Sequence, residues 1–284
     1  MTILQTYFDN KLVEAGFPGG LKIEYSLSYC QGDGMAFYGD IDFDHLPILF
    51  AKIYPDSENL KLFEEIKNEI MVAEDYYPTC KIAPNTLRYC HFNTMDLYLD
   101  YADNFALFDQ DDEKTAEIWE TLSCTKEQAA EIWNRFVDDL IDYIVETSKN
   151  LADLGYRLIE STYIESDATI KTFDTKSYRV EFKIEPIQFY ANWCAEEFGY
   201  EDINELCNAA LSGTKFVDLT AIVYQKKLGI KMGESSLGYC SYNGNDKSYA
   251  GNKRYLIHEA ISEARTFVQL ASKAAQHLRS IVIN

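Results

Sequence analysis

Several features that often reveal a protein's class are missing from this sequence of 284 residues. No two of its seven cysteines are spaced C-x-x-C, and an odd number cannot all pair within one chain. The opening residues, MTILQTYFDN, have no cationic start and no long apolar run, unlike a secretory signal. We therefore expect reduced thiols and a cytoplasmic location. No apolar stretch approaches the roughly 18 residues of a membrane span, so no membrane contact is expected.

Motifs for catalysis and for cofactors are also missing. The sequence contains no G-x-x-x-x-G-K-[ST], no G-x-S-x-G and no dinucleotide fingerprint. The four histidines are scattered, and Cys90 and His91 form the only close Cys/His pair, so a zinc site is not expected. The sequence therefore predicts no catalytic residue, no cofactor and no metal.

One group of carboxylates supports an alternative. Asp40, Asp42 and Asp44 alternate along a predicted strand, which places all three on one face. An EF-hand is excluded, because His45 and Ala51 occupy the positions that need Gly and Glu. Clustered carboxylates also hold magnesium in nucleases and phosphatases. The alternative hypothesis is a metal-dependent nuclease or phosphatase that uses these three aspartates.

Positive charge is scarce in this chain. Its 26 lysines and arginines face 46 aspartates and glutamates, which gives a net charge of -20. Nucleic acid and anionic lipid repel such a chain, so direct nucleic-acid binding is not expected. Three interpretations of the charge remain open. It maintains solubility, it attracts a partner with a basic surface, or, as a special case of the second, it imitates the DNA backbone.

The acidic residues concentrate in the middle of the chain. Residues 100–146 contain fourteen acids and three bases. Apolar residues such as Ile132, Phe136 and Leu140 recur there at helical spacing, so one face of the helix is apolar and another is anionic. The anionic face is either solvated or a surface for a basic partner. The candidate partner-binding residues are Asp138, Asp139, Asp142, Glu146, Asp111, Asp112 and Glu113.

Hydrophobic periodicity predicts an α+β fold: an N-terminal antiparallel hairpin or sheet with helices, an acidic helical middle, a smaller β region and a long C-terminal helix. Helices are expected at residues 1–16, 58–76, within 100–146, and at 150–173 (in two segments), 187–198, 201–211 and 253–283. Strands are expected at residues 21–30, 34–43, 48–54, 86–101, 177–185 and within 214–250. Thr125 and Gln128 fit a capping box at the start of the acidic helix. The expected domains are residues 1–185 and 186–284.

The expected C-terminal helix carries an apolar seam spaced alternately by four and three residues, as in a heptad. The seam either packs inside the monomer or forms a subunit interface. From Lys247 onward the chain has six bases and two acids, so its end is basic and a homo-oligomer is expected. An oligomeric structural or interaction module is therefore a second alternative function. The seam residues are Ile257, Ile261, Ala264, Val268, Ala271, Ala275, Leu278 and Val282.

Two segments resemble a family of phage-borne proteins without assigned activity. The first contains Tyr25-Ser26 and then Cys30-Gln31-Gly32-Asp33-Gly34-Met35-Ala36-Phe37, similar to that family's Tyr-Ser…Ser-Gln-Gly-Asp-Gly-Ala-x-Phe. The second, residues 156–170, resembles its Tyr-Arg-x-Leu-Glu…Tyr-x-x-x-Ser-Asp-Glu-Ala stretch. Cys30, Met35 and Ala168 depart from the family pattern. The Gly-Asp-Gly itself is predicted to be a hairpin turn, because glycine accepts positive φ angles.

The length and acidity also resemble phage-encoded inhibitors of the bacterial Gabija defence system. That resemblance implies a protein without catalytic activity. Such a protein binds and surrounds the Gabija nuclease–helicase complex in the host cytoplasm and blocks the entry of DNA. It implies no catalytic residue for this chain.

Overall fold

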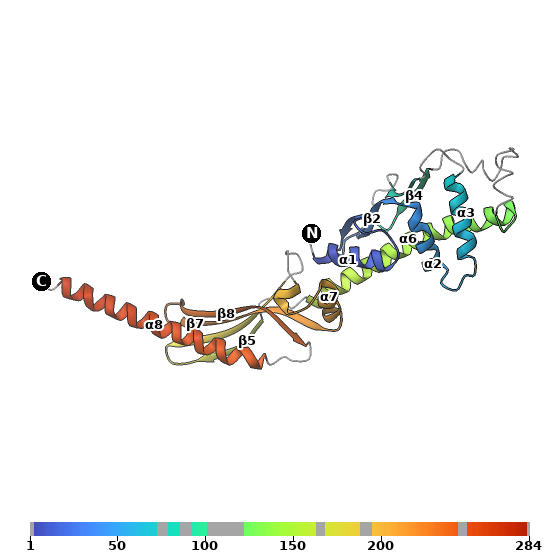
Figure 1. Ribbon diagram of the computed structural model, residues 1–284. Helices are drawn as coiled ribbons and strands as arrows, with labels where there is room; N and C mark the ends of the chain where they lie inside the picture. Colours follow the sequence, from blue (N-terminus) through green and yellow to red (C-terminus); the bar gives the residue numbers. More distant parts are fainter. Residues whose placement is uncertain are drawn as a thin grey trace. The chain divides into compact units, whose positions relative to one another are not determined.

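The computed structural model describes residues 3–72, 79–85, 92–100, 122–162, 168–187, 195–243 and 249–282. Helices accompany two four-stranded antiparallel sheets, so the predicted α+β class is confirmed (Figure 1). The chain divides into two units. The N-terminal unit is Leu4–Tyr156, and the C-terminal unit is Arg157–Asn284 together with the first three residues.

This division differs from the boundary expected at residues 185 and 186. It falls inside helix α6 (Lys126–Thr162), after Tyr156. The expected boundary lies at the end of strand β6 (Tyr178–Pro186), which pairs along its whole length with β7 (Thr214–Gln225). A cut there would separate two hydrogen-bonded strands of one sheet, which is why the chain divides earlier.

The first sheet has the strand order β1-β2-β3-β4, and every neighbouring pair is antiparallel. The β1–β2 hairpin was expected from the sequence, but β1 ends at Ser26 and not at residue 30, so residues 27–33 form a longer connection than the expected tight turn. In chain order the elements up to the acidic helix are α1 (Ile3–Glu14), β1 (Lys22–Ser26), β2 (Gly34–Ile41), the 3-10 turn η1 (Phe43–His45), α2 (Leu46–Ile53), α3 (Leu60–Val72), β3 (Thr79–Pro84), β4 (Met95–Asp100) and α6.

Helix α2 stands where a strand was expected at residues 48–54, so that prediction was wrong. The run is apolar almost throughout, and periodicity alone does not separate a short buried helix from a buried strand. Pro47 lies in the first helical turn, where its missing N–H costs no hydrogen bond. Leu46, Leu49 and Phe50 are buried, because the helix turns them inward.

The second sheet has the order β5-β6-β7-β8. Residues Ala168–Asp174 form strand β5, where a helix was expected to reach residue 173, so that prediction was wrong. The Thr, Ile and Phe residues of this segment favour a strand. Of the helix expected at residues 187–198, only the ends are described, and its last four residues form a 3-10 turn. The remaining elements are η2 (Ala195–Phe198), α7 (Ile203–Leu211), β8 (Ile230–Asn243) and α8 (Ala250–Val282).

The core of the C-terminal unit lies between one face of this sheet and the first half of α8. Phe182, Leu219 and Ala221 of the sheet are buried together with Leu256 and Ala260 of the helix. The helix lies directly on the bare backbone of β8 at Gly233. A Cβ atom there would be 2.4 Å from the carbonyl oxygen of Ala260 and 2.6 Å from the nitrogen of Ala264. Only glycine permits this close approach.

Candidate functional site

The acidic helix α6 begins with the expected capping box. The backbone N–H of Gln128 donates to Oγ1 of Thr125 at 3.3 Å, and the N–H of Thr125 donates to Oε1 of Gln128 at 3.1 Å. Glu127 follows in the first turn. Hydrogen bonds at this helix start hold the pKa of the Glu127 carboxyl below its usual value. The cap therefore fixes where the acidic face begins.

Aromatic packing holds the other side of α6 in place. Phe63 of α3 stacks on Trp133 with a centroid distance of 5.7 Å and meets Phe136 edge-on at 4.6 Å. Phe50 of α2 stacks on Phe63 at 4.3 Å. Trp133, Phe136 and Leu140 are fully or almost fully buried. The acidic face therefore lies on a helix whose position is set by a tight core.

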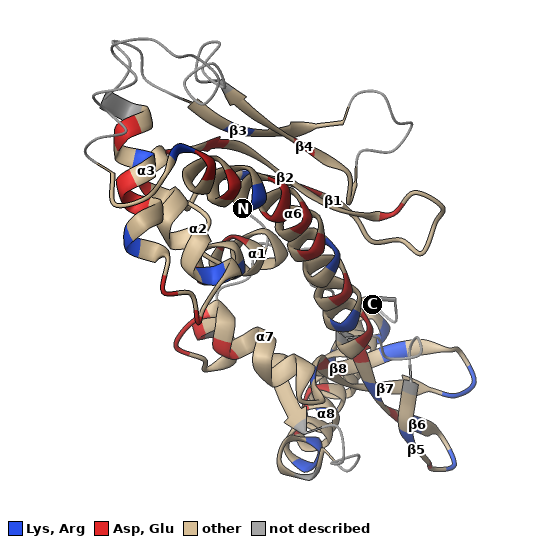
Figure 2. Ribbon diagram, turned by 90° about the vertical axis from the view of Figure 1, so that its right-hand side faces the viewer, with Lys and Arg blue, Asp and Glu red and all other residues tan. Residues whose placement is uncertain are grey.

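Three of the predicted partner-binding residues form an exposed row on α6. Asp138, Asp142 and Glu146 are all exposed and follow one another every fourth residue. Within the described ranges, none of them forms an ion pair. We call these three side chains the acidic row; Figure 2 shows acidic residues along α6 in red.

The other predicted members of that surface differ. Asp139 is partly buried: its carboxylate accepts a hydrogen bond from the hydroxyl of Tyr54 and lies 3.6 Å from Nε of Arg135. Burial first, and then Asp139, raises the pKa of the Tyr54 hydroxyl. Asp139 thus joins α6 to α2 and has little capacity left for a partner. Asp111, Asp112 and Glu113 lie outside the described residues.

The metal hypothesis loses its geometric basis. Only Asp40 belongs to strand β2; Asp42 and Asp44 come after the strand, at the 3-10 turn. Asp44 is 2.9 Å from Nζ of Lys67, and that lysine holds the pKa of the aspartate below its usual value. Among the described residues, no three His, Cys, Asp or Glu side chains gather closely enough to hold a metal ion. The shared face expected from alternation was wrong, because the strand ends at Ile41.

The Gly-Asp-Gly turn is organised around Asp33. Its carboxylate accepts hydrogen bonds from the Ser26 hydroxyl at 2.7 Å, the Ser28 N–H at 2.6 Å and the Cys30 N–H at 2.8 Å. The hydroxyl of Ser28, at 3.2 Å, and the hydroxyl of Tyr156 on α6, at 3.1 Å, also donate to it. These donors, Ser26 first, hold the pKa of Asp33 far below its usual value. A carboxylate so fully engaged is a structural anchor and a poor base.

This anchor joins the two segments that resemble the phage-borne family. The Tyr156 ring also packs on Tyr29 with a centroid distance of 4.7 Å. Tyr29 has a φ of 60°, which is rare for an aromatic residue, and its side chain is 63% exposed. Reasoning from the sequence missed the contact between Asp33 and Tyr156. Its one signal was that the two residues fall in the two segments quoted for the expected resemblance.

A second link joins the hairpin to α6 beside the first. The buried Ser148 hydroxyl donates to the carbonyl oxygen of Met35 and also lies 3.0 Å from Oδ1 of Asn93. Gly34 has a φ of 157°, and a Cβ atom there would be 2.3 Å from Nδ2 of Asn93. Glycine is therefore required at this end of the motif because a side chain would collide with Asn93.

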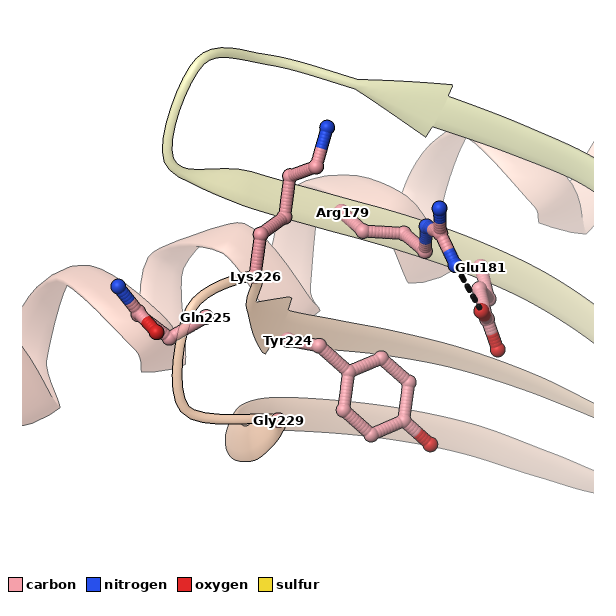
Figure 3. Close-up of a pocket in the computed structure, with 6 residues that line it drawn as sticks. All are labelled: Arg179, Glu181, Tyr224, Gln225, Lys226 and Gly229. Atoms are coloured by element: carbon pink, nitrogen blue, oxygen red, sulfur yellow. Dashed lines mark ion pairs between the residues drawn. The ribbon is translucent and has the colours of Figure 1, made fainter.

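An open groove of about 250 Å³ lies on the sheet of the C-terminal unit (Figure 3). Arg179 and Glu181 line it from β6, and Tyr224 lines it from β7. Asp174 is 3.1 Å from Nε of Arg179 and 3.5 Å from Nζ of Lys226. The charges therefore neutralise one another across neighbouring strands. The described residues that line the groove do not include a nucleophile paired with a base.

The predicted seam of α8 divides into two parts. Ala264 is buried against the sheet, and Ile257 and Ile261 are partly buried there. Val268 and Leu278 are exposed, by 39% and 62% respectively. Ala271 and Ala275 are also exposed, while the side chain of Val282 lies outside the described set. Packing inside the unit therefore accounts for only the first three members of the seam.

No helix in the described ranges combines the length and apolarity needed to cross a bilayer. Comparison with known proteins returned no match to any protein-family model, curated protein or solved structure. The resemblance to phage-borne proteins therefore stays a prediction that rests on the residues quoted for it.

Proposed function

We propose that this protein is a phage-encoded inhibitor that acts without catalysis in the host cytoplasm. It binds a bacterial DNA-processing complex, with the Gabija nuclease–helicase as the first candidate, and blocks the access of DNA. The acidic row of Asp138, Asp142 and Glu146 is the observation that carries this proposal, since it presents negative charge on a rigid helix. Self-association into a homo-oligomer belongs to the same proposal, because several copies cover more of a partner.

Charge complementarity supports this kind of partner. A protein that binds DNA presents a basic surface to the phosphates. The three carboxylates of the acidic row recur about every 6 Å along the helix axis, so they offer such a surface a line of negative charge. A net charge of -20 also steers the chain toward a basic partner and away from nucleic acid.

Binding to the purified Gabija complex tests the proposal directly. We expect the two to elute together from a sizing column and DNA cleavage by the complex to fall. The triple variant Asp138→Lys, Asp142→Lys and Glu146→Lys should lose at least about 10-fold in affinity, because charge pairs across an interface become like-charge contacts. Raising the salt concentration should weaken the wild-type complex.

A matched control separates the acidic row from net charge alone. Glu185, Glu196 and Glu259 are exposed acids of the C-terminal unit. Their triple substitution by lysine changes the total charge equally and should leave binding almost unchanged. Equal loss in both triple variants would mean that only net charge matters. Absence of binding by the wild type would rule out Gabija as the target.

A further inference from the structure

Helix α8 extends far beyond the sheet on which it begins. Its last buried residue is Ala264, and all seventeen residues from Arg265 to Ile281 are exposed. Figure 1 shows this half of α8 projecting past β7 and β8. We call residues 265–281 the overhang. Neither the sheet nor any other described element covers it.

The overhang has one apolar side. A helix turns about 100° per residue, which gathers its large apolar residues and three alanines within less than half of the circumference. This side continues the one that packs on the sheet through Leu256, Ala260 and Ala264. The residues on it are Phe267, Val268, Leu270, Ala271, Ala274, Ala275, Leu278 and Ile281.

Charge distinguishes the overhang from the rest of the chain. It contains Arg265, Lys273 and Arg279 and no acid, in a chain with 46 acids. Arg265 and Lys273 lie on the side opposite the apolar residues, and Arg279 lies at the edge of the apolar side next to Val268, so none of the three bases lies within it. The last acid before the overhang is Glu263, whose carboxylate accepts the N–H of Glu234 at 2.6 Å.

An uncovered helix of this length is only marginally stable in water, and a continuous apolar side exposed to solvent marks an interaction site. Three small residues at its centre, Ala271, Ala274 and Ala275, permit close approach of another helix. The overhang is about 25 Å long, several times the Debye length of about 8 Å at physiological salt. If the overhangs of two copies pair with their helices antiparallel, the acidic surfaces of the two copies lie farther apart than the Debye length. The electrostatic repulsion between those surfaces is then largely screened.

We propose that the overhang pairs with the overhang of a second copy of this chain, apolar side against apolar side. A second copy fits better than an anionic membrane. Binding along an anionic membrane would bring the rest of this acidic chain close to a negatively charged surface, which repels it. Two overhangs, in contrast, contact each other through segments that contain no acid. This pairing names the surface for the self-association in the proposed function, but it needs no partner protein and is measured on the isolated chain.

Analytical ultracentrifugation of the full chain over about 1–100 μM tests the pairing. Wild type should show a reversible monomer–dimer equilibrium. The double variant Phe267→Asp and Leu278→Asp should raise the dissociation constant at least about 100-fold, because it places charges in the apolar contact of both copies. Both side chains are exposed in a single copy, by 48% and 62%, so the variant should fold normally. Circular dichroism checks this.

The matched control is Gln269→Asp with Gln276→Asp. It adds the same charge to the same helix on the opposite side and should leave the equilibrium within about 3-fold of wild type. A wild type that remains monomeric throughout the range, or a Phe267→Asp, Leu278→Asp variant that still dimerises like wild type, would overturn the proposal. So would a monomer that binds vesicles of phosphatidylglycerol, since lipid would then be the occupant.

Discussion

Helices α6 and α8 are the two longest among the described elements, and both have one apolar side and one polar side. The apolar side of α6 is buried from Ala129 to Leu158. That of α8 is buried only as far as Ala264 and is exposed from there to Ile281. The charges of the two helices also differ. The polar side of α6 carries exposed acids, whereas the charged residues in the second half of α8 are all bases.

The difference shows what periodicity predicts and what it leaves open. Spacing identified the inward-facing residues Phe136 and Leu140 of α6 correctly. The same spacing in α8 continues from Ala264 to Val268 and Leu278 without any change at the point where the sheet ends. A helix sequence therefore specifies a face that needs covering. Whether the same chain or another molecule covers it depends on the tertiary structure.

The sharpest way to test this contrast is to shorten one phenylalanine on each helix. Phe136→Ala removes a ring that is 1% exposed in the aromatic core and should lower the free energy of unfolding by about 3–5 kcal/mol. Phe267→Ala, at 48% exposure, should change it by less than about 1 kcal/mol at concentrations where the chain is monomeric. Urea titration at 1 μM measures both. Equal losses would mean that the overhang is covered within a single copy.

The next largest effect concerns the point where α8 lies on its sheet. Gly233→Ala inserts a methyl group into the backbone of α8 and should destabilise the C-terminal unit by about 2–3 kcal/mol. Thermal melting followed by circular dichroism measures the loss. Gly251→Ala is the control, because open space surrounds that position on α8 and alanine favours a helix. A neutral Gly233→Ala would show that the helix can shift on the sheet without loss.

The N-terminal unit should depend on pH through Asp33. Because its folded pKa is depressed, the ionised carboxylate stabilises the fold fully above the ordinary aspartate pKa of about 4. That stabilisation is lost as the pH falls from there through the depressed value. Asp33→Asn should therefore lower the melting temperature at pH 7, and its deficit relative to wild type should shrink below pH 4. A deficit that does not vary with pH would argue against an ionic role.

The smallest effect is expected at the link between the motif turn and α6. Tyr156→Phe removes one hydrogen bond to Asp33 and keeps the ring beside Tyr29, so it should cost about 1 kcal/mol of stability. Tyr255→Phe is the control, since that side chain is 63% exposed on α8. Chemical denaturation compares the two. If Tyr156→Phe behaves like the control, the hydroxyl does not hold the turn.

Local chemistry in the sequence predicted much of the fold. The capping box at Thr125, the hairpin and the long helix α8 follow from spacing and turn residues, whereas α6 was expected as separate segments before and after residue 150 and is one helix. The α2 helix did not, because a short apolar run lacks a distinguishing period; Pro47 was the available signal. The pairing of Asp33 with Tyr156 could not be derived, since a contact across 123 residues depends on how the whole unit folds.

The candidate partner surface was predicted in part. Asp138, Asp142 and Glu146 are exposed as helical spacing requires. Asp139 follows Asp138 directly and looked equivalent in the sequence, but one position round the helix brings it against Tyr54 of another element. Composition reveals how many carboxylates a segment has, whereas only packing decides which of them face the solvent.

The hydrogen bond between Asp33 and Tyr156 has a consequence for tracing ancestry. Loss of Asp33 removes the acceptor of the Tyr156 hydroxyl, and loss of that hydroxyl removes one of the donors to Asp33, so changes at the two positions interact. Substitutions at the two positions should therefore be coupled as lineages diverge. A search profile that requires both segments together should detect distant relatives that either segment alone would miss. Chains that retain only one of the two residues should be rare among them.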